Sequence, residues 1–170
     1  MRRKIDIRTR NLVMSAVFAA LICASTFVIK IPSPLQGYIN LGDCFVLLAS
    51  WLLIRRLGVL SSALGSALAD LIAGYAIFAP ATFVIKGLMA LVCYHCFKAV
   101  KKNAKTGLAA IVSGIAAECV MMLGYFIYES FLYGIKAASA GISFNAIQGA
   151  VCIVPACLLY NMLGARVGAK

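Results

Sequence analysis

The chain is a succession of apolar runs, most of them long enough to cross a lipid bilayer, with few residues between them. A transmembrane helix needs about 20 mostly apolar residues, so 170 residues have room for six such runs and their connections. The composition is 64% hydrophobic, with a mean hydropathy of +0.99, which is more apolar surface than a soluble domain buries. We therefore expect an all-α integral membrane protein, with residues 1–170 forming a single transmembrane domain.

Prolines, glycines and basic clusters interrupt the apolar pattern and delimit six expected transmembrane helices. These runs are Leu12–Ile31, Leu41–Ile54, Leu57–Ala76, Pro80–Phe97, Thr106–Leu132 and Ile142–Leu163. Pro32 and Pro34 end the first run, so Ile31–Asn40 is expected to be a loop. Gly134–Gly141 is expected to be the last link, and no separate soluble domain fits.

The net charge of +11 indicates membrane topology and contact with anionic lipid. Positively charged residues favour cytoplasmic loops. With six alternating spans and a cytoplasmic N-terminus, thirteen of the sixteen basic residues fall on the cytoplasmic side, and the exceptions are Lys30, Lys86 and Lys136. Five or seven spans give a poorer bias, so both termini are predicted to be cytoplasmic. The basic clusters lie between apolar runs, and we expect no nucleic-acid partner.

Ionisable groups at membrane depth are costly and usually functional. The topology places Asp43, Asp70, Lys86 and Glu129 in the outer half of the membrane, and Glu118 near its middle. Glu118 shares one helix face with Met122, Tyr125 and Glu129, as Thr82 does with Lys86, and Asn145 with Gln148 and Cys152. The predicted ligand-binding residues are Asn40, Asp43, Asp70, Tyr75, Thr82, Lys86, Glu118, Tyr125, Asn145 and Gln148.

This convergence predicts a polar pocket that opens to the outside and suits a small aromatic or polar ligand. Two pairs also have structural interpretations. Tyr125 and Glu129 could anchor their helix at the interface, and Asn145 and Gln148 could hydrogen-bond between helices.

The remaining ionisable groups also have structural interpretations. Asp70 and Lys86 could simply pair with each other and hold their two helices together, with or without a ligand. Asp43 could cap the N-terminus of its helix, where a carboxylate suits the helix dipole.

Small residues mark a second kind of surface. Ala16, Ala20 and Ala24 follow strict i, i+4 spacing on the first run, and such stripes let helices approach closely. A second stripe of the same spacing consists of Gly58, Ser62 and Ser66. Both could serve internal packing, and the alanine stripe could instead dock another membrane protein.

The sequence lacks the motifs of several kinds of enzyme and binding site. The sequence has no G-x-x-x-x-G-K-[ST], HExxH or GxSxG pattern, so ATP binding through a P-loop is excluded and hydrolase chemistry is not expected. Cys93, His95 and Cys96 have no second ligand pair nearby in sequence, so no metal site is predicted. We expect no cofactor and no enzymatic activity.

The segment from Gly37 to Leu91 resembles a known family. It contains Gly-Tyr-Ile-Asn-Leu-Gly-Asp43, Gly65-Ser-Ala-Leu-Ala-Asp70-Leu, Gly74-Tyr75, Ala79-Pro80-Ala-Thr82 and Ile85-Lys86-Gly87. These motifs are similar to those of the substrate-binding S components of energy-coupling factor (ECF) vitamin transporters. The nearest group is the small riboflavin-type one, which includes proteins for vitamin B6 and hydroxymethylpyrimidine.

The resemblance implies six helices, in the plasma membrane of a prokaryote, that bind a vitamin with high affinity near the outer face. It implies that Ile31–Asn40 acts as a lid and that Ala16, Ala20 and Ala24 contact a transmembrane T subunit, while two ATPase subunits supply energy. The S component is thought to topple in the membrane as it carries the ligand inward. The resemblance does not identify the ligand, because pockets differ within the family. A heteroaromatic compound like riboflavin, pyridoxine or hydroxymethylpyrimidine fits best.

Two alternatives stay open at this point. The carboxylates Asp70, Glu118 and Glu129 could form the proton path of an autonomous ion-coupled transporter or small channel. An enzyme acting on lipid head groups is the other alternative, but the acids are spread over three helices without a DxxD-type pair.

Overall fold

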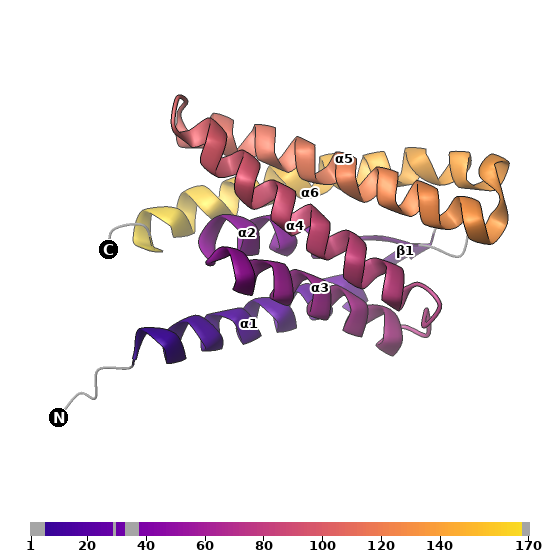
Figure 1. The fold of residues 1–170 in the computed structure, drawn as a ribbon, viewed down its shortest axis with the longest axis horizontal. Coiled ribbons are helices and arrows are strands. Elements are labelled where there is room, and N and C mark those ends of the chain that lie inside the picture. Colours follow the sequence, from indigo (N-terminus) through magenta and orange to yellow (C-terminus); the bar gives the residue numbers. More distant parts are fainter. Residues whose placement is uncertain (1–5, 29, 33–37, 168–170) are drawn as a thin grey trace.

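The computed structural model describes residues 6–28, 30–32 and 38–167, and within them the chain forms helices and one short β-hairpin. The elements are α1 (Ile7–Val28), β1 (Lys30–Pro32), β2 (Tyr38–Asn40), α2 (Gly42–Leu52), α3 (Arg55–Ile72), α4 (Ala79–Lys101), α5 (Thr106–Tyr133) and α6 (Ile135–Val167). The helices run back and forth along one long axis, so that α1 begins and α6 ends at the same end of the bundle (Figure 1). The all-α prediction holds for the described residues apart from the hairpin.

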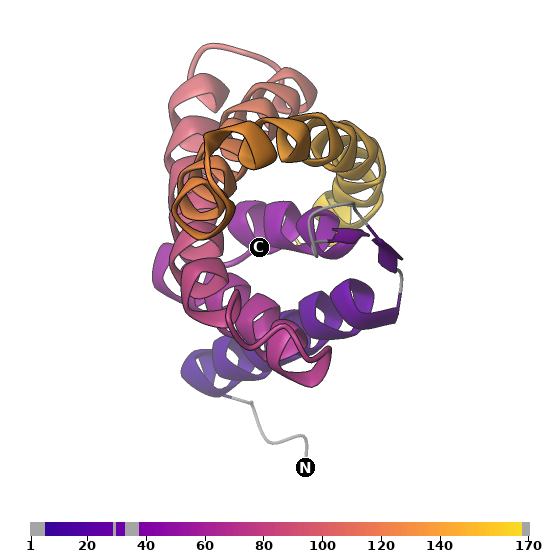
Figure 2. The same ribbon diagram turned by 90° about the vertical axis from the view of Figure 1, so that its right-hand side faces the viewer.

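The short helix α2 lies at the centre of the bundle. It packs against each of the other five helices, which surround it in the end-on view of Figure 2. Nine of its eleven residues are buried, including Val46, Leu47 and Leu48. A helix that is apolar on all sides is stable only when it is enclosed, and this position encloses it.

Helix α2 is too short to cross a bilayer. Eleven residues span about 16 Å, roughly half of the 30 Å hydrocarbon core. Among the residues that the structure describes, four helices are long and apolar enough to cross a membrane, namely α1, α4, α5 and the stretch Ile135–Leu163 of α6. The expected second span is therefore a half-length helix, and the number of crossings stays a prediction.

The hairpin occupies the end of the bundle opposite the start of α1 (Figure 1). Its strands are antiparallel, with Lys30 opposite Asn40, Ile31 opposite Ile39 and Pro32 opposite Tyr38. The sequence analysis expected Ile31–Asn40 to be a loop, and this is wrong at both ends of that segment, because β1 and β2 pair there. Strand β2 contacts α1 and α6, and residues 33–37 lie outside the described residues.

The predicted last link is also wrong. The structure continues α6 back to Ile135, so most of Gly134–Gly141 is helical. The turn between α5 and α6 is made at Gly134, whose φ is +84°, a conformation that glycine adopts without steric cost. Serine and alanine in this segment are compatible with a helix, which the interpretation as a link overlooked.

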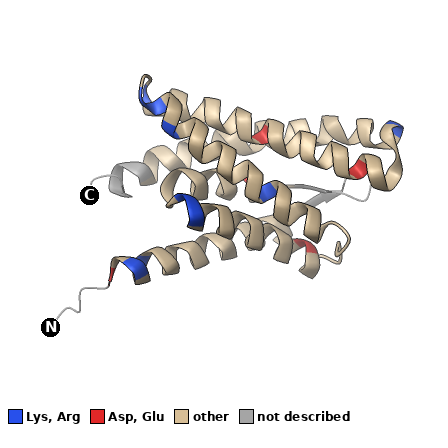
Figure 3. Cartoon of the chain, viewed as in Figure 1, with Lys and Arg blue, Asp and Glu red and all other residues tan. Residues whose placement is uncertain are grey.

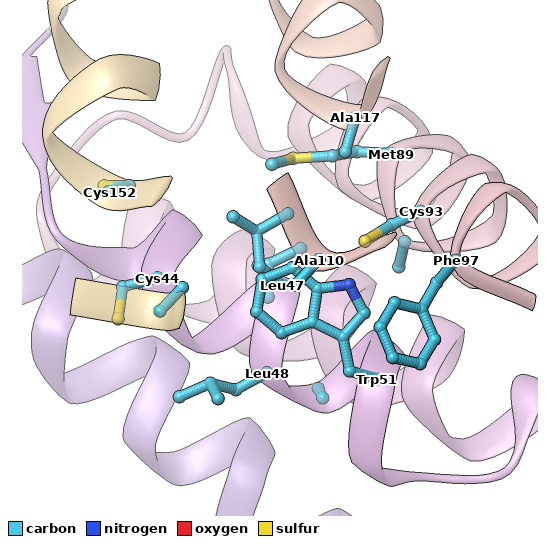
Figure 4. Packing of buried hydrophobic residues seen from close by; sticks show 14 of the residues in the cluster. Cys44, Leu47, Leu48, Trp51, Met89, Cys93, Phe97, Ala110, Ala117 and Cys152 are labelled. Carbon is cyan, nitrogen blue, oxygen red and sulfur yellow. The ribbon is translucent and has the colours of Figure 1, made fainter. Parts of the chain in front are cut away.

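The bundle end that carries the basic clusters has an aromatic core. The Trp51, Phe97 and Tyr160 rings contact one another with centroids 5.5–6.0 Å apart, and the Trp51 indole N–H donates to the Ser113 hydroxyl at 3.0 Å. Leu47 and Met89 continue this core (Figure 4). It fixes the C-terminal half of α2 against α4, α5 and α6.

Helices α1 and α3 approach each other closely. The hydroxyl of Ser61 donates to the carbonyl of Ser15 at 3.0 Å, and a Cβ added at Gly65 would lie 2.5 Å from the carbonyl oxygen of Ala19. The second small-residue stripe is buried at all three of its positions, Gly58, Ser62 and Ser66. Its interpretation as internal packing is confirmed.

Most of the basic residues that the structure describes gather at one end of the bundle, where α1 begins and α6 ends; Lys86 and Lys136 are exceptions (Figure 3). Arg55 and Arg56 start α3 there, and Lys98 and Lys101 lie in the last turn of α4. The charge asymmetry inferred from the sequence is thus present in the fold. Which side of the membrane this end faces stays a prediction.

Gly65→Ala is expected to destabilise the bundle, because its Cβ meets the main chain of α1 at a distance that real Cβ atoms do not tolerate. Overpacking of this kind costs about 1–3 kcal/mol, so the thermal unfolding midpoint in detergent should fall by several degrees. Gly107→Ala is the matched control, since nothing lies within 4 Å of its added Cβ. Equal midpoints for the two variants would contradict the close approach.

Candidate functional site

A buried ion pair lies at the start of α2. The Asp43 side chain is fully buried, and its carboxylate pairs with the Lys86 ammonium of α4. Its second oxygen accepts a hydrogen bond from the Gln148 amide of α6 at 2.5 Å. Three helices far apart in the sequence therefore meet at one carboxylate.

This geometry overturns two structural alternatives. Asp70 and Lys86 were expected to pair with each other, but the ion pair that Lys86 makes among the described residues is with Asp43. Asp43 was expected to cap α2, but it lies inside the first turn and its carboxylate makes no cap hydrogen bond. Asn40 serves the start of α2 instead, because its side-chain oxygen accepts from the Gly42 N–H at 2.8 Å.

Asn40 also ties the hairpin to α6. Its main-chain and side-chain N–H groups both donate to the Gln148 oxygen, at 2.9 and 3.3 Å. The Cys152 thiol, one helical turn further along α6, donates to the Asn40 carbonyl at 3.4 Å. Asn40, Asp43, Lys86 and Gln148 thus form one connected group, which we call the polar network.

A second pair borders the polar network. The Thr82 hydroxyl of α4 lies 3.0 Å from the Tyr125 hydroxyl of α5. The Lys86 ammonium lies 5.5 Å from the centroid of the Tyr125 ring, within the range of a cation–π interaction. Tyr125 therefore contributes both a hydroxyl and an aromatic face to the site.

Glu118 of α5 is buried beside this group, with only 4% of its surface exposed. Neither of its carboxylate oxygens has a hydrogen-bond partner in the part of the chain that the structure describes. The charges of Asp43 and Lys86 both act on it. It packs so closely against α6 that a Cβ added at Gly149 would lie 3.0 Å from its Cβ and Cγ atoms.

Three further predicted ligand-binding residues are Asp70, Tyr75 and Asn145. Asp70 is in the last turn of α3, and its charge acts on Tyr125. Tyr75 lies in the turn between α3 and α4, where its main-chain N–H donates to the Asp70 carbonyl at 2.8 Å. Asn145 is half-buried on α6, one turn before Gln148. Whether these three contact a ligand stays a prediction.

Two small contributors were missed by the sequence analysis. Gly149 gives Glu118 its space, and Gly42 lets Thr26 and Asn40 crowd the start of α2, because an added Cβ there would lie 2.0 Å from the Thr26 hydroxyl oxygen. Glycine beside the predicted ligand residues Asp43 and Gln148 was the available signal. Only the helix packing shows what these glycines accommodate.

The alanine stripe lies on the surface. Ala16, Ala20 and Ala24 are all exposed, whereas Phe18, Ile22 and Thr26 form the buried side of α1. Internal packing, the alternative interpretation of the stripe, is thereby contradicted for these described residues. The stripe is available to lipid or to another protein.

Comparison with known proteins gives the chain its family. The family model "ECF-type riboflavin transporter, S component" matches residues 6–165. The chain belongs to this family. An uncharacterized protein from Pyrococcus woesei is 32% identical over 148 residues, which cover 86% of this chain and 97% of that protein.

A solved structure shares the fold. This is the S component of a bacterial ECF transporter, which has a TM-score of 0.69 and 24% sequence identity, with 93% of this chain and 97% of that chain covered. S components are membrane-embedded substrate-binding subunits that work with T and ATPase subunits, and they are not enzymes. The resemblance seen in the sequence is confirmed, and the chain is a multi-pass membrane protein.

Separating the ion pair should destabilise the protein strongly. Asp43→Asn and Lys86→Met each leave one buried charge without its partner, which costs about 3–5 kcal/mol, while the double variant should recover most of that loss. Thermal unfolding of the four proteins in detergent gives the coupling between the two residues. Lys136→Met is the control, since Lys136 is exposed. Additive single effects would show that the pair is not formed.

Proposed function

We propose that this S component is the high-affinity binding subunit for uptake of a B-type vitamin or vitamin precursor with a heteroaromatic ring, such as riboflavin, pyridoxine or hydroxymethylpyrimidine. One observation carries the proposal: a group of charged and amide side chains, buried among apolar helices, gathers around the N-terminus of α2. Soluble nutrients need such groups, because polar atoms removed from water must find partners.

The side chains of the site support a ligand of this class. Tyr125 offers a ring for stacking, as well as a hydroxyl that is already oriented by Thr82. Charged and amide groups from α2, α4 and α6 are held by mutual hydrogen bonds, so little ordering is needed when a ligand arrives. A discontinuous helix that exposes polar backbone near mid-membrane is a common setting for transport sites.

Entry from outside the cell would pass the hairpin. The network reaches β2 through Asn40 and Gln148, so that movement of the hairpin would break the same hydrogen bonds that organise the site. We infer that Ile31–Asn40 acts as a lid and that the end carrying α1's start faces the cytoplasm of a prokaryotic cell.

Energy would come from partner subunits. The chain has no P-loop, consistent with ATP hydrolysis elsewhere in the complex. We propose that the exposed stripe of Ala16, Ala20 and Ala24 docks onto the T subunit, because small side chains allow a partner helix to approach closely. Two ATPase subunits would complete the assembly.

The purified chain is expected to bind a B vitamin without ATP. A ligand at 100 times its Kd stabilises the folded state by about 2.7 kcal/mol, so riboflavin, pyridoxine, pyridoxamine and hydroxymethylpyrimidine should be screened by thermal shift in detergent. Gln148→Leu should weaken the binding of any hit, because it removes the link between Asp43 and Asn40. Proton-driven uptake into liposomes by this chain alone would instead favour an autonomous ion-coupled transporter.

Ala20→Trp should prevent assembly with the T and ATPase subunits while leaving vitamin affinity unchanged, because the indole would hold the partner helix away. Copurification of the tagged complex and isothermal titration of the isolated subunit give the two readouts. Ala150→Trp on the exposed side of α6 is the matched control. Loss of assembly in both variants, or loss of ligand binding in Ala20→Trp, would argue against a docking surface on α1.

A further inference from the structure

We propose that the ligand of this site carries an amino group, either a protonated amine or an amino-substituted aromatic ring, whose N–H groups donate to the Glu118 carboxylate. The inference rests on the proposed function and specifies the chemical class of the ligand. It starts from Glu118, the carboxylate of the site that the structure leaves without hydrogen bonds among the described residues.

Leaving Glu118 in this state is costly. Its side chain is 96% removed from solvent, since 4% of its surface is exposed, and a buried acceptor without a donor forfeits its hydration with no return. A buried charge is costlier still unless a partner balances it. A ligand that supplies the missing donor explains why such a group is retained, and the position of Glu118 beside the polar network makes it the ligand contact that we assign.

The neighbouring donor groups contact other acceptors, and among the described residues none of them reaches a Glu118 oxygen. The Lys86 ammonium is paired with Asp43, and the Gln148 amide donates to the same carboxylate. The Tyr125 hydroxyl lies within hydrogen-bond distance of Thr82, and the Cys152 thiol donates to Asn40. Since none of these groups donates to Glu118 in the structure, a ligand N–H is the donor that we assign to it.

The charges around the site favour a particular kind of ligand group. Two buried acids, Asp43 and Glu118, belong to this part of the bundle, and the Lys86 ammonium among the described residues is already paired with Asp43. Attraction between opposite charges is strong where water is absent. A cationic or strongly N–H-donating ligand group balances the second carboxylate, whereas an anionic group would be repelled by it.

Packing holds Glu118 in place. Gly149 lies against its Cβ and Cγ atoms, and a Cβ at that position would also lie 3.1 Å from one carboxylate oxygen. The side chain is therefore confined between α5 and α6. A carboxylate fixed in this way presents two acceptor oxygens in one plane, which matches paired N–H groups on one ligand.

Two matched probe pairs test the ligand class. Pyridoxamine and pyridoxine differ by an aminomethyl in place of a hydroxymethyl group, and 4-amino-5-hydroxymethyl-2-methylpyrimidine can be compared with its 4-hydroxy analogue. Isothermal titration in detergent should give at least a tenfold lower Kd for the amino member of at least one pair. Riboflavin, which has no amino substituent, should not bind more tightly than that probe.

Glu118→Gln tests the residue. It keeps the shape of the side chain but removes the charge and one acceptor, so the preference for the amino probe should fall to within about threefold. Asp6→Asn makes the same chemical change at an exposed position and should leave the preference unchanged. If Glu118→Gln does not fold, as judged by its thermal unfolding midpoint, the comparison of probes on the unaltered protein still decides.

The possible failures are distinct. Binding of a vitamin-like probe without preference for the amino member, or an unchanged preference in Glu118→Gln, would overturn this inference and leave the proposed function standing. Absence of binding by every probe would overturn the proposed function, and this inference with it.

Discussion

The ion pair between Asp43 and Lys86 is the interaction on which the rest of the site depends. Apolar packing alone allows helices in a membrane to rotate and slide, because lipid is as apolar as their side chains. A buried carboxylate that binds an ammonium on α4 and an amide on α6 permits one arrangement of these helices. Asn40, Cys152 and Tyr125 then take their places around that arrangement.

The half-length of α2 explains why such a group lies inside the bundle. Every helix leaves its first N–H groups without helical partners, and inside an apolar bundle these groups need partners from the surrounding protein. The Asn40 side-chain oxygen accepts a hydrogen bond from the N–H of Gly42. Asn40 also belongs to the hairpin, where it lies opposite Lys30. The connection between the hairpin and α2 therefore lies at the same place as the polar network.

The fold class and most of the site follow from the sequence because both rest on strong rules. Long apolar runs predict membrane helices, and ionisable or amide residues inside them predict a functional cluster. Asn40, Asp43, Thr82, Lys86, Tyr125 and Gln148 were chosen on this basis, and the structure brings them together. The basic clusters that separate the apolar runs likewise lie together at one end of the bundle (Figure 3).

The predictions that were wrong concern features that depend on which segments pack together in space. A pair between Asp70 and Lys86 was one structural alternative, but Lys86 pairs with Asp43, because α2 lies at the centre of the bundle and packs against α4. The hairpin was missed because Pro32 and Pro34 argue against a strand, although edge pairing tolerates proline. The start of α6 was misplaced because glycine and serine at 134–141 read as a link, while a single turn at Gly134 suffices.

The enclosure of α2 on every side has a consequence for biogenesis. A segment of eleven residues is too short to integrate stably by itself, and its first turn carries a carboxylate whose counter-charge lies on a helix made later by the ribosome. The Asp43 carboxylate can meet both of its partners only after α4 and α6 have been synthesised. The centre of the protein is therefore complete only when its last helix is present.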